Sequence, residues 1–348
     1  MYAHLRPLLW SLEPELAHNI AIQLIRFGFL NIYSSSPHAD LEVSVGDLSF
    51  PSPIGMAAGF DKNAEVFDQL FKIGFGFVEV GTGTPIAQEG NPKPRIFRLE
   101  QDKSLINSLG FNNIGIDKIC INIANNLNPK SIQKLGINIG PNKDSKDRIN
   151  DYVESLKKVQ SQSDYVTINV SSPNTPNLRN FENEELDELL KEIKLNRLSN
   201  KPIFLKVSPD IENKQLGLII ESIIEYGLNG IVLTNTTKSR DLKLESKSYP
   251  NNGGLSGKPL FGLSNKKISF AYGVTKGEIS IIGVGGIFSG EDAYKKIKLG
   301  ANLVQLYTSF VYEGPGLIKK INSEIVSLMK KEGVENLSEI VGANNKLK

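Results

Sequence analysis

Several apolar, β-branched runs of the sequence end in polar side chains that could bind a ligand or move a proton. The clearest case is segment 169–176, NVSSPNTP, where two prolines restrict the backbone while amide and hydroxyl groups stay available for hydrogen bonds. Lys206 lies inside the apolar run 203–207, where an ammonium group needs an anion or a carbonyl group to stabilise it. These residue types predict a polar pocket that contains a buried cation.

Polar residues also end or follow the other runs, and their number favours one shared pocket. A single Thr or Asn at the end of a strand is more often a turn former or a cap than a ligand-binding residue. So many polar residues at the ends of strands in one chain are more than turns and caps alone would require. The positions are Lys62, Thr82, Asn138, Asn169, Lys206, Thr234, Asn235 and Thr236.

Two glycine-rich or hydroxyl-rich strand ends predict a phosphate-binding site. Segment 282–287 has the sequence IGVGGI, Ser289 and Gly290 open the helix that follows, and the next run ends at 305–309 with QLYTS. Glycine lets backbone N–H groups close on an anion, and in barrel enzymes phosphate sites lie after the seventh and eighth strands. Tight turns without a ligand are the alternative, but the coincidence of both strand ends favours a phosphorylated ligand.

The composition excludes several kinds of chemistry. Lys+Arg 40 against Asp+Glu 38 gives a net charge of +2, which lacks the basic field that a nucleic-acid backbone requires, so we expect no nucleic-acid partner. The single cysteine, Cys120, falls in an expected surface helix and cannot form an internal disulfide, a Cys-rich zinc site or an iron–sulfur cluster. The three histidines, His4, His18 and His38, precede all the strand-end residues, so we expect neither a Ser-His-Asp triad nor a metal site there.

The absence of histidine also limits how a proton could be removed. A serine of segment 169–176 is a poor base on its own, because its hydroxyl hardly ionises in water. It would need desolvation, a nearby cation such as Lys62 and a relay that carries the proton away. This suggests that the difficult step belongs to a bound cofactor, which the protein positions.

Strands and helices alternate from residue 54 onward, and this alternation predicts an α/β fold. Nearly continuous apolar runs are typical of parallel strands buried on both faces, and eight of them favour a closed (β/α)8 TIM barrel. An open doubly wound sheet is the alternative, but it usually shows GxGxxG after its first strand, where this chain has AGFDK. The expected strands cover residues 54–58, 77–80, 136–139, 165–170, 203–207, 230–234, 280–284 and 303–307.

Two long spacings and two terminal segments complete the expected domain organisation. The segments 85–135 and 236–279 are long insertions after strands, and at the active face of a barrel such insertions form lids or pocket walls. We expect a helix pair with its linker at 1–37, the barrel at 38–341, and a polar, frayed tail at 342–348.

The N-terminal segment predicts two short amphipathic helices. The second begins near Glu13, with Pro14 at an early position where its missing N–H costs nothing, and an apolar face follows at helical spacing. The pair could be a cap on the barrel or a module lying in a membrane interface, with Arg6 and Arg26 available to lipid headgroups. No run of 18 uninterrupted apolar residues and no signal-peptide pattern occurs, so we expect neither a membrane span nor secretion.

Short motifs occur in a fixed order over nearly the whole chain. They are AAGFDK (57–62), GTGTP (81–85), NPKPRIFRL (91–99), NSLGFNN (107–113), GINIG (136–140), NVSSPNTPNLR (169–179), LKVSPD (205–210), TNTT (234–237), GGLSG (253–257), IIGVGGI (281–287) and VQLYTSF (304–310). Together they closely resemble the motifs of the quinone-dependent, membrane-associated class 2 dihydroorotate dehydrogenases. The blocks NVSSPNTPNLR and GGLSG together with TNTT are highly specific, whereas GVGG alone would be weak.

The resemblance implies FMN as cofactor and dihydroorotate as substrate, with a serine as the base. Ser172 would take a proton from the substrate, with Thr175 as part of a proton relay and Phe111 beside it. The residues implied around FMN are Ala58, Gly59, Thr82, Asn138, Asn169, Lys206 and Thr234, with Gly257, Gly286, Tyr307 and Thr308 near its phosphate. The residues implied around the substrate are Lys62, Asn107, Ser108, Leu109, Gly110, Phe111, Asn169, Asn174, Asn235 and Thr236.

Within the family, the base and the helix pair distinguish the classes. The soluble class uses a cysteine as base, whereas here a serine occupies the matching block and Cys120 lies outside any such pattern. Ser108 and Leu109 depart from the bulkier or basic residues common in the substrate segment, but the flanking residues are retained. The soluble class lacks the N-terminal helix pair. The resemblance therefore implies that the pair is a membrane and quinone module and not only a cap on the barrel.

The resemblance also implies a location and partners. The quinone site would be lined by His18, Arg98 and Tyr307, with ubiquinone or menaquinone as acceptor. We expect a monomer associated peripherally with the cytoplasmic face of a bacterial inner membrane, or a mitochondrial protein that has lost its targeting segment. Two other classes stay open: a soluble FMN barrel oxidoreductase with another acceptor, and a non-catalytic membrane-associated barrel that binds a phosphate ligand.

Overall fold

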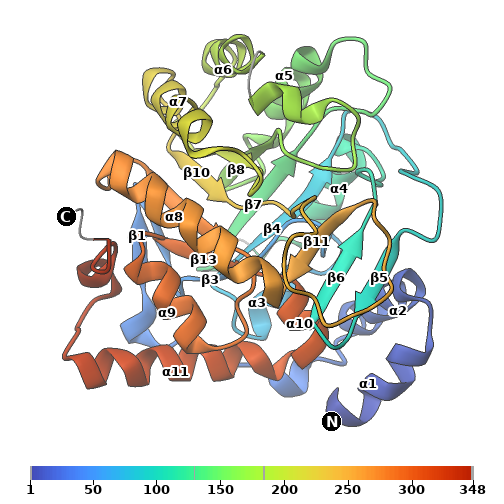
Figure 1. The fold of residues 1–348 in the computed structure, drawn as a ribbon, viewed down its shortest axis with the longest axis vertical. Helices are drawn as coiled ribbons and strands as arrows, with labels where there is room; N and C mark the ends of the chain where they lie inside the picture. Colours follow the sequence, from blue (N-terminus) through green and yellow to red (C-terminus); the bar gives the residue numbers. More distant parts are fainter. Residues whose placement is uncertain (1, 129, 183–184, 346–348) are drawn as a thin grey trace.

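Eight parallel strands form a closed barrel in the computed structural model of the chain, which describes residues 2–128, 130–182 and 185–345 (Figure 1). The barrel closes where β13 pairs with β3, with Val304 opposite Ile54. The predicted TIM barrel is therefore confirmed, and the open doubly wound sheet was the wrong alternative. The barrel strands are β3 (Ile54–Met56), β4 (Phe77–Gly83), β7 (Lys134–Ile139), β8 (Tyr165–Asn169), β9 (Ile203–Val207), β10 (Gly230–Leu233), β12 (Ser280–Val284) and β13 (Leu303–Leu306).

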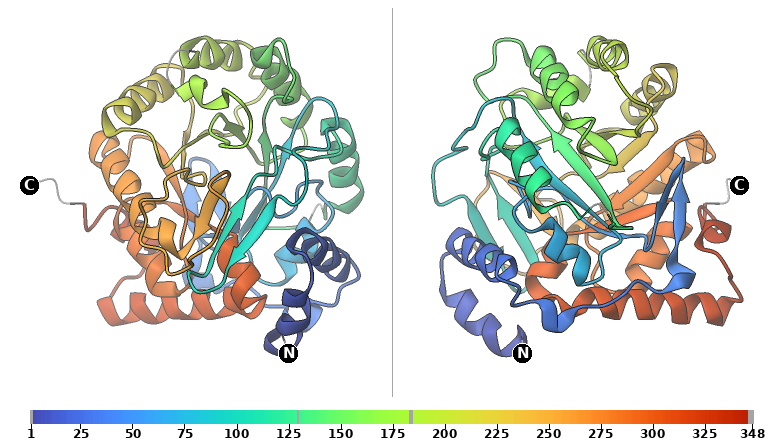
Figure 2. Two further views of the ribbon diagram at one scale, coloured as in Figure 1. Left: turned by 45° about the vertical axis from the view of Figure 1, so that its right-hand side comes forward. Right: turned by 180° about the vertical axis from the view of Figure 1, so that it is seen from behind.

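Helices surround the barrel (Figure 2, left). In α7, the buried residues Leu216, Ile219, Ile220 and Ile223 recur at helical spacing, which gives the helix one apolar side. Cys120 lies on α4, as predicted. The helices after the N-terminal pair are α3 (Phe67–Lys72), α4 (Ile116–Asn126), α5 (Arg148–Val159), α6 (Leu186–Leu195), α7 (Asn213–Glu225), α8 (Phe261–Thr275), α9 (Gly290–Lys298), α10 (Thr308–Glu313) and α11 (Gly316–Glu332).

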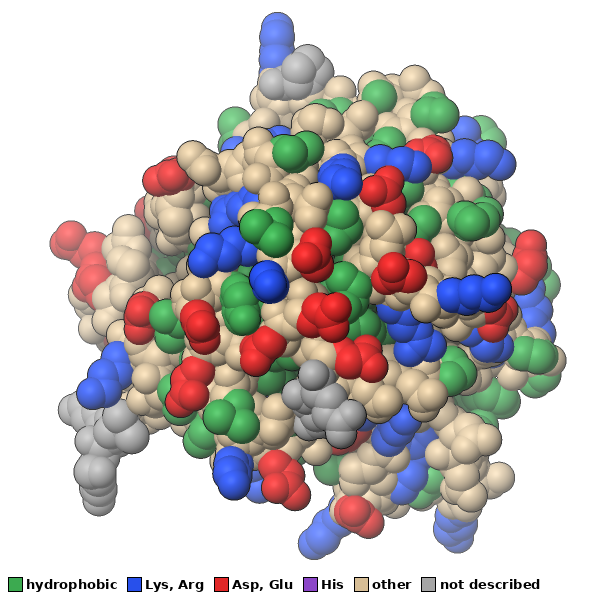
Figure 3. All heavy atoms as spheres, turned by 90° about the horizontal axis from the view of Figure 1, so that it is seen from above, with side chains coloured by type: hydrophobic (Ala, Val, Ile, Leu, Met, Phe, Trp, Pro, Cys, Tyr) green, Lys and Arg blue, Asp and Glu red, His purple; other side chains and the backbone are tan. Residues whose placement is uncertain are grey.

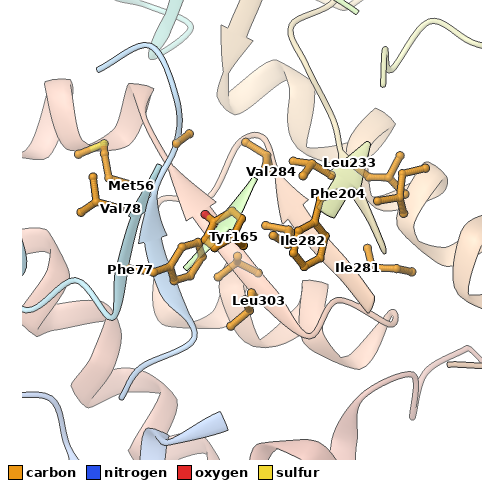
Figure 4. Packing of buried hydrophobic residues seen from close by; sticks show 14 of the residues in the cluster. Met56, Phe77, Val78, Tyr165, Phe204, Leu233, Ile281, Ile282, Val284 and Leu303 are labelled. Atoms are coloured by element: carbon orange, nitrogen blue, oxygen red, sulfur yellow. The ribbon is translucent and has the colours of Figure 1, made fainter. Parts of the chain in front are cut away.

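Aromatic rings fill one end of the barrel. Tyr165 packs edge-on against Phe77 and Phe204, with ring centroids 6.3 Å and 5.5 Å away (Figure 4). A Cβ atom at Gly136 would lie only 2.1 Å from the Tyr165 ring, so this position needs glycine. The hairpin β1 (Val43–Val45) and β2 (Leu48–Phe50) places Phe50 against Phe77, 5.4 Å between centroids. This end of the barrel is therefore closed, and a ligand site must use the other.

The two insertions meet in a small antiparallel sheet beside the barrel mouth. Segment 85–135 supplies β5 (Ile96–Leu99) and β6 (Ser104–Asn107), and segment 236–279 supplies β11 (Gly254–Gly257). The strand order is β11-β6-β5, with Gly254 opposite Asn107. Insertions far apart in sequence therefore build one wall together, as their predicted role as lids or pocket walls requires.

The N-terminal helices are α1 (Tyr2–Ser11) and α2 (Pro14–Arg26), and they lie next to β5 (Figure 1). The predicted start of the second helix is confirmed, because the Glu13 carboxylate caps it by accepting a hydrogen bond from the Leu16 N–H. Among the described residues, no helix combines the length and the apolar character needed to cross a bilayer.

The C-terminal tail is attached to the barrel helices over residues 342–345, and its predicted fraying is wrong for this part. The Gly342 N–H donates to the Ile297 carbonyl at 3.1 Å, and the Asn345 side chain donates to the Ser269 carbonyl at 2.6 Å. Residues 346–348 lie outside the described part. The short 3-10 helices of the chain are η1 (Asn31–Tyr33), η2 (Ala39–Leu41), η3 (Leu178–Glu182), η4 (Lys258–Leu260) and η5 (Leu337–Ile340).

Candidate active site

A cavity opens at the carboxyl ends of the barrel strands, between the barrel and the sheet β11-β6-β5. Its wall combines polar side chains with glycine and apolar residues, which is typical of a ligand-binding site. Thr82, Asn169 and Lys206 reach it from β4, β8 and β9, while Asn107 and Ser256 reach it from β6 and β11. Residues from seven of the barrel strands or their ends thus meet in one place.

Most of the residues singled out from the sequence line this cavity. They are Ala58, Gly59, Lys62, Thr82, Asn107, Leu109, Gly110, Phe111, Asn169, Ser172, Asn174, Lys206, Thr234, Asn235, Thr236, Gly257, Gly286, Tyr307 and Thr308. Five others are not among the lining residues. Asn138 lies fully buried behind the wall, Ser108 and Thr175 lie next to lining residues in the chain, and His18 and Arg98 lie towards the N-terminal helices.

The asparagines form a hydrogen-bonded wall in which each amide has a defined direction. Asn169 donates from Nδ2 to Thr82 Oγ1 and to Asn138 Oδ1, both at 3.2 Å. Asn235 donates from Nδ2 to Asn169 Oδ1 at 3.2 Å. Asn174 donates to Asn107 Oδ1 at 3.0 Å and thereby joins the loop after β8 to β6. Amides held in this way can present donors and acceptors to the edge of a polar ring.

Two buried lysines give the cavity its positive charge. Burial lowers the pKa of Lys62 to about 8, and the nearby Glu15 carboxylate opposes this shift. Burial also lowers the pKa of Lys206, against the opposing effect of Glu79. The face in Figure 3 carries acidic and basic side chains interspersed, without a large field of one sign. The positive charge that could pair with an anionic substrate inside the cavity is that of Lys62 and Lys206.

Ser172 lies where a base could reach a ligand in the cavity. Its side chain is 6% exposed, and its Oγ accepts a hydrogen bond from the Asn174 N–H at 3.3 Å. Thr175 Oγ1, three residues further on, is buried and has no hydrogen-bond partner within the described part of the chain. A hydroxyl without a partner in the protein is available to a ligand or to a water molecule.

The end of the cavity near β12 and β13 suits a phosphate group. Gly285 and Gly286 have φ values of +120° and +73°, a backbone conformation that glycine adopts without strain. The hydroxyls of Ser256 and Thr308 lie 2.8 Å apart on the same cavity wall. Backbone N–H and hydroxyl donors therefore converge where the sequence predicted a phosphate.

The three residues expected around a quinone fall into two groups. The His18 and Tyr307 rings both pack edge-on against Phe60, with centroids 5.3 Å and 6.0 Å away. Burial lowers the pKa of His18 to about 3, so this imidazole is neutral at physiological pH. Arg98 instead donates to the carbonyls of Trp10 and Leu12, both at 3.0 Å, and so holds the turn between α1 and α2.

Comparison with known proteins identifies the family. The family model described as dihydroorotate dehydrogenase matches residues 40–329. The chain belongs to the dihydroorotate dehydrogenase family. The proteins of this family are flavin-dependent oxidoreductases. The resemblance derived from the motifs is confirmed.

Curated relatives of the chain are named as members of the quinone-dependent class. The protein named dihydroorotate dehydrogenase (quinone) from Rhodospirillum rubrum is 42% identical over 346 residues, 98% of this chain and 94% of that one. Its namesake from Bradyrhizobium diazoefficiens is 44% identical over 349 residues, 97% of this chain and 94% of that one. The crystal structure of DHODH from Eimeria tenella in complex with ferulenol has a TM-score of 0.91 at 36% identity and covers 96% of each chain.

No role was assigned to Ser256, Gln305 or Glu79 in the sequence analysis. Ser256 and Gln305 line the cavity, and Glu79 lies fully buried behind it. The signal for two of them was present, because a carboxylate in the run FVEV and an amide in LVQL interrupt otherwise apolar strands. Ser256 stands in the GGLSG block that carried the resemblance.

Proposed function

We propose that this family member oxidises (S)-dihydroorotate to orotate in de novo pyrimidine biosynthesis, with FMN as bound cofactor and a membrane quinone as electron acceptor. The observation that carries the proposal is the cavity at the barrel mouth, where Ser172 lies together with two buried lysines and the asparagine wall. The names of the curated relatives support the choice of substrate and acceptor.

The cavity residues fit FMN. Gln305 Oε1 is buried and has no partner within the described residues, so an acceptor is available for a ring N–H group. Gly286 and the Ser256–Thr308 hydroxyl pair offer donors to the phosphate. When bound, FMN supplies the acceptor for the hydride that leaves carbon 6 of the substrate and passes the electrons on to the quinone. The residues that would hold it are Ala58, Gly59, Thr82, Asn138, Asn169, Lys206, Thr234, Gly257, Gly286, Tyr307 and Thr308.

The substrate would lie between the cofactor and the wall made by β6 and the loop after β8. The ammonium of Lys62 would pair with the substrate carboxylate, because a buried ammonium group needs an anion beside it to offset the cost of leaving water. The side-chain amides of Asn107, Asn174 and Asn235 would form hydrogen bonds with the C=O and N–H groups of the pyrimidine ring. Asn169 and Thr236 would lie beside them. Segment 108–111 would close over the ring and bring Phe111 against it.

Ser172 would act as the base that takes the proton from carbon 5. Its burial excludes water, and the charge of Lys62 favours the transient serine alkoxide. As Ser172 Oγ takes the carbon 5 proton, its own hydroxyl proton would move to Thr175 Oγ1, and the hydroxyl proton of Thr175 would leave to water. Positioned proton transfer of this kind contributes about 10²–10⁴-fold to rate, so the serine carries a substantial part of the catalysis.

The N-terminal helix pair would bring the quinone from the membrane to the cofactor. Leu8 and Phe27 are 67% and 75% exposed on this pair, which suits contact with lipid. His18 and Tyr307 on either side of Phe60 would line the quinone path, with Arg98 at its edge. We place the protein as a peripheral monomer on the cytoplasmic face of a bacterial inner membrane.

An anaerobic absorption spectrum tests the whole proposal. Dihydroorotate should bleach the flavin band of the purified protein, and a short-chain ubiquinone should then restore it. No bleaching would refute the substrate assignment. Bleaching without return, but with return on addition of fumarate or NAD, would favour the soluble barrel oxidoreductase with another acceptor.

A further inference from the structure

Glu79 is a fully buried carboxylate inside the barrel, and the function proposed above gives it no role. It belongs to β4 and accepts four hydrogen bonds from three other strands. Asn138 Nδ2 donates to its Oε1 at 2.8 Å. Tyr165, Thr167 and Gln305 donate to its Oε2 at 3.2, 3.1 and 2.9 Å. All four partners donate, so the carboxylate is fully satisfied inside the barrel without water.

The carboxylate determines the direction of the amides around it, because an ionised carboxylate only accepts hydrogen bonds. Asn138 must therefore turn its NH₂ group towards Glu79 and its Oδ1 towards the cavity wall. That Oδ1 accepts from Thr82 Oγ1 at 2.6 Å and from Asn169 Nδ2 at 3.2 Å. Asn169 is then left with its own Oδ1 facing Asn235, which donates to it at 3.2 Å.

The same reasoning applies to Gln305 on the opposite side of Glu79. Its Nε2 donates to the carboxylate, so its Oε1 must point the other way. This oxygen is buried, lacks a partner within the described part of the chain, and belongs to a residue that lines the cavity. One buried anion therefore leaves an acceptor at Gln305 and orients Asn169 and Asn235.

We propose that Glu79 is a positioning residue that fixes the donor and acceptor direction of the amides facing the ligands. The inference rests on the function proposed above, since both FMN and dihydroorotate carry an imide edge of alternating carbonyl and N–H groups. A reversed amide would face such an edge with donor against donor or acceptor against acceptor. Glu79 touches neither ligand and acts through Asn138, Asn169 and Gln305.

Two isosteric variants test this direction. Glu79→Gln can donate as well as accept, so Asn138 is no longer held in one orientation. In Glu79→Gln/Asn138→Asp the carboxylate moves to position 138, accepts from the glutamine, and still accepts from Asn169 Nδ2. Thr167→Val is the matched control, because it removes one donor to Glu79 and leaves the amide direction unchanged.

The measurement is orotate affinity in the FMN holoenzymes, followed by the change in flavin absorption, with FMN retention measured alongside. We expect Glu79→Gln to weaken orotate about tenfold or more, the factor given by one lost buried hydrogen bond. The double variant should recover most of this loss, and Thr167→Val should stay within about twofold of the wild type.

The outcomes distinguish a failure of this inference from a failure of the proposed function. Wild-type affinity in Glu79→Gln, or a folded double variant that binds no better than the single one, overturns the inference. If Glu79→Gln does not fold, the double variant becomes the test, and its failure to fold while Thr167→Val folds overturns the inference as well. A wild-type holoenzyme that does not bind orotate refutes the proposed function instead.

Discussion

Replacing Glu15 by alanine should weaken the attachment of the N-terminal helix pair while the barrel stays folded. Glu15 lies in the first turn of α2 and is 6% exposed. Its Oε1 lies 2.7 Å from Arg95 Nη2, and its Oε2 accepts from Arg95 Nε at 3.0 Å. Arg95, itself 4% exposed, directly precedes β5. The pair is therefore a buried, two-point connection between the helix pair and the wall of the cavity.

The magnitude follows from what alanine leaves behind. Arg95 Nη1 keeps its bonds to the Glu89 and Asn91 carbonyls, at 2.6 and 2.8 Å, but the charge loses its carboxylate. Breaking a buried pair from one side costs about 3–5 kcal/mol. The buried side chains Ile22 and Ile25 of α2 contribute about 1.5–3 kcal/mol each. The variant thus removes roughly half of the interaction energy that holds α2 in place.

The assay is amide hydrogen exchange, resolved over α2 and over the barrel strands. In Glu15→Ala, exchange of α2 should accelerate by about 10²–10⁴-fold, while β8 and β9 keep wild-type protection. Under the proposed function, reduction of a short-chain quinone should fall much more than reduction of a water-soluble dye. The control is Lys93→Ala, because Lys93 is 63% exposed at 3.4 Å from Glu15, and such pairs contribute about 0–1 kcal/mol.

A pH dependence accompanies this prediction. The hydrogen bonds from Arg95 hold the pKa of Glu15 below its ordinary value of 4.5. A carboxyl group with a lowered folded-state pKa stabilises the fold above the unfolded value, and this contribution is lost as the pH falls through the folded one. Protection of α2 should therefore decrease below about pH 4.5 in the wild type and not in Glu15→Ala. Unchanged protection of α2 in Glu15→Ala at neutral pH would refute the reasoning.

Three further predictions concern the cavity and the barrel. Ser172→Ala should keep its flavin but slow flavin reduction by dihydroorotate by about 10²–10⁴-fold in anaerobic stopped flow; a wild-type rate would remove Ser172 from the role of base. Orotate affinity should decrease above about pH 8, where Lys62 loses its proton, and Lys62→Met should bind weakly at every pH between 7 and 9 in flavin titrations. Burial lowers the pKa of Lys296 on α9 to about 7, although its Nζ donates to Ser264 and Asn265 at 2.9 and 2.8 Å. Above this pH the unfolded state binds more protons than the folded state, so the free energy of unfolding should rise with pH. Between pH 7 and 10, urea denaturation should show the wild type gaining about 3 kcal/mol relative to Lys296→Met. The same pH dependence in both proteins would contradict the lowered pKa of Lys296.

The sequence alone was sufficient for the barrel and for most of the cavity. Each barrel strand is a short apolar run, so its neighbours in the chain determine where it begins and ends. Because parallel strands place all their carboxyl ends on one face of a barrel, the polar residues that follow the runs were bound to meet. Lys206, Asn169 and Asn235 line one cavity for this reason. The start of α2 was equally local, since Glu13 and Pro14 supply both cap and first turn.

Only the tertiary structure decided which side chains pair across the chain. Glu15 and Arg95 are 80 residues apart, and Glu79 and Gln305 are 226 apart. The residues next to Glu15 or Glu79 in the sequence do not indicate which group will pair with the carboxylate. A buried charge is satisfied by whichever group the fold brings within hydrogen-bond distance. The same holds for Arg98, which was expected at a quinone site and lies on the carbonyls of the turn between α1 and α2. Strand limits and turn chemistry are properties of neighbouring residues, whereas the direction of an amide in the cavity depends on a carboxylate that the closed barrel places behind it.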